Sequence, residues 1–305
     1  MPKAAQQLQS ARTAKARTSR PKTRAKKAGT GARPQRKPKH RYTAASADKH
    51  VLYQKAVQAP DLDCAFCERV FRREYARTPL HLREDFCGTA LISAEWLRRG
   101  AARTAEGFDI DFEPVAWGLA HNFGVDRHGR AADAERFNFH LKDVREHGRR
   151  APDVRIAFNF SYWVFKERAD LLAYFRAAHD SLGDEGLFII DLYGGSDATM
   201  ELEDRRRCGG FTYIWDQARF WPGTGEFLCH IRFRFPDKTE LKAFTYDWRF
   251  WSLTELRDVL REAGFARVDS YFEGEGEDGE GDGIYRRGIR GENCASWLAY
   301  LVAVK

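Results

Sequence analysis

The segment 80–122 places the tightest constraint on how this chain can fold. It opens with alternating apolar and polar residues, passes through the turn FCGTA at 86–90, and continues as an apolar run that stops at Gly100. A second predicted strand then ends in Asp109 and Asp111. This order predicts one βαβ unit. Because small turn residues let backbone amides approach a ligand, and a carboxylate can accept hydrogen bonds from ribose hydroxyls, the segment predicts a site for a nucleoside-bearing ligand.

Strands and helices continue to alternate beyond this unit. Predicted strands at 137–144, 152–160 and 187–195 accompany an amphipathic helix at 166–182. The strand at 187–195 is almost continuously apolar, which is typical of a buried strand in a parallel sheet. The pattern predicts a doubly wound, mostly parallel, Rossmann-like α/β sheet that binds ligands at the carboxyl ends of its strands.

Polar residues fall at four of these strand ends. They are Glu84, Asp109, Asp143 and Asn159. Because the carboxyl ends of parallel strands share one edge of a sheet, we expect these side chains to converge there.

Together these segments resemble the class I S-adenosylmethionine (SAM)-dependent methyltransferases, over roughly residues 80–195. The segments that carry the resemblance are EDFCGTA at 84–90, GFDID at 107–111, LKDV at 141–144, NFSYW at 159–163 and LGDEGLFIIDLYGG at 182–195. The resemblance implies SAM as the cofactor, with Glu84 near the methionine amino group and Gly88 at the close backbone approach. It also implies that Asp109 meets the ribose and Asp143 the adenine amine. The cofactor-binding residues implied are Glu84, Phe86, Cys87, Gly88, Thr89, Asp109, Ile110, Asp143, Val144 and Asn159.

The first turn departs from the family pattern at two positions. Phe86 and Ala90 stand where that family usually has glycine. Since Phe86 has a Cβ atom, we expect either a negative φ there or a displaced ligand. The glycines are too few to cradle a pyrophosphate, which favours SAM over a dinucleotide. Asp111 can share the ribose or cap the next helix, and we favour the cap.

An antiparallel β insertion is predicted at 196–250, after the fifth strand. Three stretches alternate apolar or aromatic residues with polar ones, at 211–221, 226–235 and 241–251. This insertion can cover the ligand site or form a homodimer contact, and its aromatic side chains can line a pocket or simply pack against the core. The insertion residues considered for a substrate pocket are Tyr213, Trp215, Phe220, Tyr246, Trp248, Gln217, His230, Arg232 and Arg249. The substrate residues predicted over the whole chain are Tyr53, Ser161, Tyr162, Tyr246 and Arg249.

The remaining segments complete the predicted organisation. A capped helix begins after Ser252, and two last strands at 266–274 and 294–304 bring the main sheet to seven strands. The acidic, glycine-rich stretch 273–283 between them predicts a flexible loop. The predicted units are a disordered basic tail at 1–44, a helical entry segment at 45–78, the SAM-binding core at 79–195, the insertion at 196–250 and the C-terminal helix and strands at 251–305.

Charge is divided unevenly along the chain. Residues 1–41 contain fourteen Lys and Arg and no acid, which leaves 37 basic against 44 acidic residues, a net charge of −7, for the rest. Such a tail cannot bury enough apolar surface to fold, and it suits non-specific contact with nucleic acid. The acidic remainder argues against a nucleic-acid substrate.

Cysteine usage and hydropathy predict a cytoplasmic setting without membrane contact. The six cysteines are scattered, and no apolar run approaches the ~20 residues that span a bilayer. Cys64 and Cys67 form a CxxC pair, but no second ligand pair of zinc spacing follows, so we expect two buried helix residues and no metal.

The sequence thus predicts a SAM-dependent methyltransferase that acts on a small molecule by in-line displacement, with no single catalytic base assigned. An RNA- or ribosome-directed methyltransferase recruited by the basic tail is the alternative, because NFSY at 159–162 faintly resembles the Asn-Pro-Pro-Tyr motif of such enzymes. A non-catalytic SAM-binding protein is a third alternative, disfavoured by the four polar strand ends.

Overall fold

The computed structural model describes residues 42–124, 135–276 and 281–305. The predicted basic tail therefore lies, except for its last three residues, outside the described residues.

A large mixed sheet forms the centre of the molecule. Its strand order is β11-β10-β12-β5-β4-β1-β2-β3. Neighbouring strands among β1 to β5 are parallel, whereas the pairs β5-β12, β12-β10 and β10-β11 are antiparallel. This order confirms the predicted doubly wound α/β core. The strands are β1 (His81–Asp85), β2 (Thr104–Asp109), β3 (Phe137–Leu141), β4 (Val154–Ala157), β5 (Leu187–Gly194), β10 (Arg267–Glu275), β11 (Gly281–Arg287) and β12 (Trp297–Val304).

The sheet has eight strands, where seven were predicted. The additional strand is β11, and it begins inside the stretch 273–283 that was expected to be a loop. Asp282 accepts the amide N–H of Ile284 and pairs with Arg286 at 2.8 Å, while Tyr285 packs in the core. These contacts stabilise a strand in a stretch whose composition alone favoured a loop.

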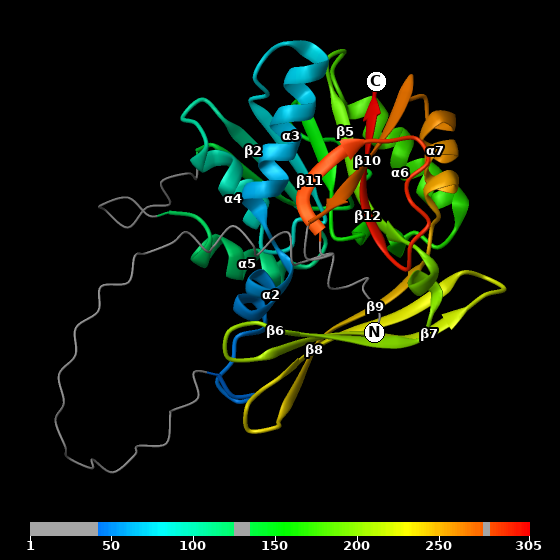
Figure 1. The fold of residues 1–305 in the computed structure, drawn as a ribbon. Coiled ribbons are helices and arrows are strands. Elements are labelled where there is room, and N and C mark those ends of the chain that lie inside the picture. Colours follow the sequence, from blue (N-terminus) through cyan, green and yellow to red (C-terminus); the bar gives the residue numbers. More distant parts are fainter. Residues whose placement is uncertain (1–41, 125–134, 277–280) are drawn as a thin grey trace, which may run out of the picture.

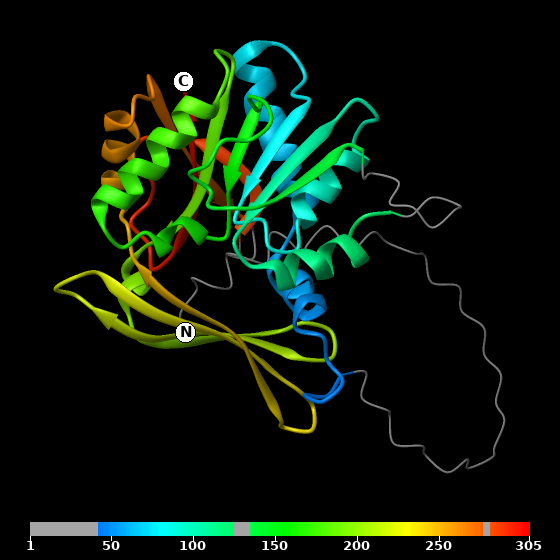
Figure 2. The same cartoon turned by 180° about the vertical axis from the view of Figure 1, so that it is seen from behind.

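Helices cover both faces of this sheet. Figure 1 shows α3 and α4 in front of it, and Figure 2 shows α6 and α7 on the opposite face. The predicted serine cap of α7 is confirmed as a capping box of Ser252 with Glu255. The helices are α2 (Lys49–Val57), α3 (Pro60–Tyr75), α4 (Leu91–Arg98), α5 (Phe112–His121), α6 (Arg168–Ser181) and α7 (Leu253–Glu262), with short 3-10 turns η2 (Ser161–Val164) and η3 (Ser196–Thr199).

The insertion folds as a separate antiparallel sheet in the order β6-β7-β8-β9. It lies across one end of the core, next to α2 (Figures 1 and 2). It has four strands, where three were predicted, because β6 carries five charged residues among six and shows no apolar alternation. The strands are β6 (Leu202–Arg207), β7 (Thr212–Trp221), β8 (Glu226–Arg234) and β9 (Glu240–Arg249).

The entry helices pack against the core as predicted. Cys64 and Cys67 are buried on α3, where the Cys64 thiol donates to the Ile92 carbonyl at 3.7 Å. Within the described residues, no group of three or more His, Cys, Asp and Glu side chains could hold a metal ion. None of the described helices is long and apolar enough to cross a membrane.

Candidate active site

A cavity of about 560 Å³, here called the main cavity, opens between the carboxyl ends of the parallel strands and β9. This volume lies within the roughly 300–1,000 Å³ typical of small-molecule sites. The structure brings eleven of the predicted site residues together in its lining. They are Glu84, Phe86, Cys87, Gly88, Thr89, Asp109, Ile110, Asn159, Tyr53, Ser161 and Tyr246.

The turn after β1 forms the floor of the main cavity. Phe86, Gly88 and Ala90 all have positive φ, at 53°, 51° and 50°. Of the two alternatives expected for Phe86, the negative φ is therefore wrong, and the displaced ligand stays a prediction. The Phe86 ring packs against Phe165 and Tyr174, at centroid distances of 6.0 and 5.8 Å. These contacts offset the strain of a left-handed backbone at a residue that has a side chain.

Asp109 ties this turn to the end of β2. Its carboxylate accepts the Gly88 amide at 2.7 Å and the Asp111 amide at 2.9 Å. Burial raises the pKa of Asp109, against the lowering effect of these hydrogen bonds. Asp111 caps α5 by accepting the Glu113 amide, which confirms the predicted cap.

Glu84 lies at the inner wall of the main cavity. Its carboxylate accepts the amide and the hydroxyl of Ser93 near the start of α4, at 2.8 and 2.6 Å. Only 4% of the residue is exposed, and burial raises its pKa to about 7.

The charged lining of the main cavity is almost entirely acidic. The acids are Glu84, Asp85, Asp109, Asp111 and Asp247, and no lysine or arginine of the described chain joins them. Asp85 and Asp247 have basic partners outside the lining. Asp109 and Asp111 make the cavity negative, and Glu84 adds its charge as pH rises through about 7. Such a cavity attracts a cation and repels phosphates, so the residues present fit the ammonium and sulfonium groups of SAM and oppose a dinucleotide.

Ile110 adds an apolar surface beside these acids. It is 78% exposed although it is a large hydrophobic residue, and it lines the main cavity directly after Asp109. An exposed isoleucine in this place suits packing against a ligand ring.

Asp191 on β5 positions Asn159, which lines the main cavity, and sequence reasoning did not include Asp191 among the site residues. Its carboxylate accepts the amides of Asn159 and Phe160, at 2.8 and 3.0 Å, and both residues have positive φ. The signal was present in the sequence, because Asp191 is the one charged residue in the apolar stretch LFIIDLYGG.

Helix α2 forms part of the roof. Gln54 donates to the Thr89 hydroxyl and to the Asn122 side chain, both at 3.0 Å. His50 lies 2.9 Å from a Glu113 carboxylate oxygen, and it lines the main cavity together with Tyr53. These contacts hold α2 above the turn after β1.

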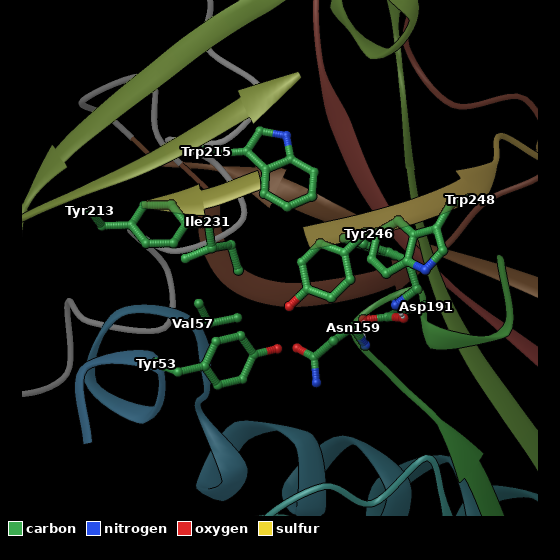
Figure 3. Close-up of a pocket in the computed structure, with 10 residues that line it drawn as sticks. Tyr53, Val57, Asn159, Asp191, Tyr213, Trp215, Ile231, Tyr246 and Trp248 are labelled. Atoms are coloured by element: carbon green, nitrogen blue, oxygen red, sulfur yellow. Dashed lines mark hydrogen bonds between the residues drawn. The ribbon is translucent and has the colours of Figure 1, made fainter. Parts of the chain in front are cut away.

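A second, smaller cavity lies beside the main one, and Figure 3 shows the residues that line it. About 40 Å³ of space is available inside it. We call it the aromatic pocket, and its lining residues are Tyr53, Val57, Asn159, Phe160, Asp191, Tyr213, Trp215, Ile231, Tyr246 and Trp248. The two linings share Tyr53, Asn159, Tyr246 and Trp248, which therefore mark the junction between the cavities.

Four predicted site residues lie outside both linings. Asp143 pairs with Arg145 at 2.8 Å, a partner only two residues away, and this pair lowers the pKa of Asp143. Val144 is buried, and Tyr162 donates its hydroxyl to the Asp191 carbonyl. Arg249 donates to the Lys166 carbonyl and stacks on a tryptophan ring. These local partners hold the side chains away from the cavities.

Sequence comparison finds no family model that matches the chain, and no curated protein sequence matches it. Solved structures do match. One is a SAM-dependent methyltransferase from Clostridium acetobutylicum, with a TM-score of 0.59 at 14% identity over 84% of this chain and 97% of that one. Another is CalS10 from Micromonospora echinaspora, an amino pentose methyltransferase, with a TM-score of 0.56 at 14% identity over 84% and 96%.

A third match is the sugar N-methyltransferase KedS8 from Streptoalloteichus, with a TM-score of 0.54 at 15% identity over 91% of this chain and 99% of that one. At identities this low, the similarity shows that the fold is shared and does not identify the substrate of this chain. The chain has the class I fold of the SAM-dependent methyltransferases.

Proposed function

We propose that the protein is a SAM-dependent methyltransferase whose acceptor is a small molecule. The observation that carries this proposal is the negatively charged main cavity at the carboxyl ends of the parallel strands, with Glu84, Gly88 and Asp109 placed around it. The fold shared with known SAM-dependent methyltransferases supports the same conclusion.

Each of these residues has a role that follows from its position. Glu84 pairs with the methionine ammonium, and Asp109 accepts hydrogen bonds from the ribose hydroxyls while it fixes the Gly88 amide. Ile110 packs against the adenine ring. Bound SAM supplies a methyl group on a positively charged sulfur, and the protein aligns the acceptor with that methyl group.

Asp143 and Val144 are left out of this assignment. Asp143 is engaged by Arg145 at the end of β3, and neither residue lines a cavity. Their predicted contact with the adenine stays a prediction.

A small acceptor is favoured over RNA by the chemistry of the same surface. RNA carries a phosphate at every nucleotide, whereas no basic side chain except His50 lines either cavity in the described chain. The size of the aromatic pocket also suits a small chemical group. Two of the structural neighbours act on sugars by their descriptions, which supports a small acceptor here.

Calorimetric titration with SAM and S-adenosylhomocysteine tests the cofactor. We expect binding of both, and a loss of affinity of about tenfold or more in Asp109→Ala, because charged hydrogen bonds to the ligand disappear. Asp258→Ala, at an exposed aspartate of α7 outside both linings, is the matched control, and its affinity should stay close to that of the wild type. Absence of binding by the wild-type chain would overturn the proposal.

The acceptor class is tested separately, by methyl transfer to a panel of small metabolites and to RNA. The full chain and a chain lacking residues 1–41 are compared. Labelling of RNA that depends on residues 1–41 would favour the tail-recruited alternative over a small acceptor.

A further inference from the structure

The aromatic pocket has an arrangement that points to the chemical class of the acceptor. It lies beside the main cavity, and the two linings share Tyr53, Asn159, Tyr246 and Trp248. These four residues therefore border both the aromatic pocket and the space in which the methyl donor would lie.

Three rings of the insertion sheet form one wall of the pocket. Tyr246 and Trp248 stack at a centroid distance of 4.3 Å, and Trp215 lies 6.2 and 6.4 Å from these two rings. Trp163, which belongs to the core, packs edge-on against Trp248, with 5.9 Å between the ring centroids. Packing from both sides therefore fixes the ring orientations, and the π faces of such rings attract cations.

Oxygen atoms converge at the junction. Figure 3 shows the hydroxyl groups of Tyr53 and Tyr246 and the side-chain amide of Asn159 directed toward the same point. Burial raises the pKa of Tyr246 well above its usual range, and a hydrogen bond with Tyr53 contributes to the shift. The Tyr246 hydroxyl therefore stays protonated at neutral pH, and the phenolic oxygens at the junction can accept a hydrogen bond from an N–H donor.

The formal charge in this pocket is negative. Asp191, 1% exposed, is its one charged residue, and no lysine, arginine or histidine of the described chain lines it. Asp191 also holds the backbone of Asn159 in place. A positively charged group that carries N–H bonds and small alkyl substituents matches all three properties: the π faces, the convergent oxygens and the buried carboxylate.

We propose that the aromatic pocket receives the amino group of the acceptor, so that the enzyme methylates an amine. This inference rests on the proposed methyl transfer. The lone pair of the neutral amine forms a bond to the methyl carbon, the bond from that carbon to sulfur breaks, and its electron pair stays on sulfur. A thioether and an ammonium ion result.

This reaction moves a positive charge from sulfur to nitrogen, toward the rings and Asp191. The pocket thus stabilises the charge as it develops, which lowers the barrier as well as binding the group. An acceptor that arrives as an ammonium ion first gives up a proton to water, because only the neutral amine attacks, and the methylated ammonium ion is the product that leaves. A hydroxyl acceptor would need a base at the site of attack, and the two tyrosines bordering the junction are poor bases.

The size of the pocket limits what enters it. About 40 Å³ of available space holds a head group of a few heavy atoms and no sugar ring. The rest of the acceptor must therefore lie in the main cavity, beside Thr245 and Asp247 of β9.

Binding of two isosteric probes tests the proposal without any turnover. Dimethylaminoethanol is a cation at pH 7, and isoamyl alcohol is its neutral carbon analogue. We expect calorimetry on the full chain, loaded with S-adenosylhomocysteine, to give about tenfold tighter binding of the cation. Equal affinity for the two probes, or tighter binding of the alcohol, would overturn the proposal.

Variants of the pocket sharpen this test. Trp248→Leu should weaken the binding of the cation more than the binding of the alcohol. Trp221→Leu is the matched control, because Trp221 is 42% exposed and lies outside both linings. Tyr246→Phe keeps the ring and removes the hydroxyl. It should lower the affinity for dimethylaminoethanol by about fivefold and leave the affinity for choline, which has no N–H, nearly unchanged. An equal effect on both cations contradicts the assigned role of the hydroxyl.

The same titrations separate this inference from the proposed function. If S-adenosylhomocysteine binds and the cation is not preferred, the amine proposal fails while the methyltransferase proposal stands. If the chain does not bind S-adenosylhomocysteine, the methyltransferase proposal fails, and the preference for the cation is then measured on the unloaded chain.

Discussion

Glu84 holds its carboxyl group where water scarcely reaches, and its pKa of about 7 ties both stability and ligand binding to pH. The unfolded chain binds this proton with a pKa near 4.5, so the folded protein holds the proton more tightly. The stabilisation from Glu84 is therefore complete below about pH 4.5 and lost as pH rises through about 7, for a total of about 3 kcal/mol.

Glu84→Gln should remove this part of the pH dependence, because glutamine is neutral and can still accept the Ser93 amide. We expect the variant to gain stability relative to the wild type at pH 8 and not at pH 4. Urea unfolding of both proteins without ligand, at the two pH values, measures the difference. A stability difference that does not change with pH would contradict the raised pKa.

SAM affinity should follow the same group in the opposite sense. The ligand ammonium pairs with the ionised form of Glu84, so we expect affinity to rise as pH increases through about 7. Glu84→Gln should bind weakly and with little pH dependence. Titration from pH 6 to 8 decides, and a wild-type affinity that stays flat over this range would separate Glu84 from the ammonium.

At the scale of elements, a buried charge network joins β1 and β4 to the segment that follows β3. Asp85 accepts hydrogen bonds from Arg83 at 2.8 Å, from Arg155 at 2.6 Å and from Tyr174 of α6 at 2.7 Å. Both guanidinium groups also donate to the Val144 carbonyl. Because Asp85 lines the main cavity, the network fixes this part of the cavity wall.

Arg155→Met should therefore destabilise the protein by about 3 kcal/mol, because it leaves a buried carboxylate with one cation fewer. Arg168→Met on α6 is the control. Arg168 pairs with Glu262 at the surface, where solvent screens the charges, so its loss should leave the free energy of unfolding nearly unchanged. Similar free energies of unfolding for the two variants would argue against a structural role of the buried network.

The elements that the sequence did not predict share a physical cause. β6 is an edge strand, and its charges form ion pairs such as Arg205 with Glu203. Such charges protect an edge from pairing with other chains, and they erase the apolar alternation that identifies a strand. β11 lies at the edge of the main sheet, and the glycines and charged residues of its sequence GDGIYRR likewise obscure the apolar alternation of a strand.

For the whole molecule, the main cavity has walls from two sheets that are far apart in sequence. Its floor follows β1 and β2, and its roof includes Tyr246 and Trp248 of β9. S-adenosylhomocysteine should therefore slow amide hydrogen exchange in both places. Protection confined to the core, with β9 unchanged, would show that the insertion does not enclose the ligand.

The floor could be predicted from the sequence, whereas the roof could be predicted only in part, as an insertion that can cover the site and as the substrate residues Tyr53 and Tyr246. Strand ends in a parallel sheet meet by topology, so Glu84, Asp109 and Asn159 were found from pattern alone. The meeting of Tyr53 with Tyr246 depends on how helix α2 packs against the insertion sheet, which local patterns do not encode. Asp143 lies outside both linings because the nearby Arg145 holds its carboxylate, and its predicted contact with the adenine stays a prediction.

The turn after β1 has a consequence for how such a site is recognised in other chains. Phe86 and Ala90 occupy two positions where glycine is usual, yet the backbone takes the left-handed conformation at both. The loop thus has the left-handed backbone that glycine adopts most easily, with other residues at two of its positions. A search by residue identity passes over this loop, whereas a search by backbone angles retrieves it.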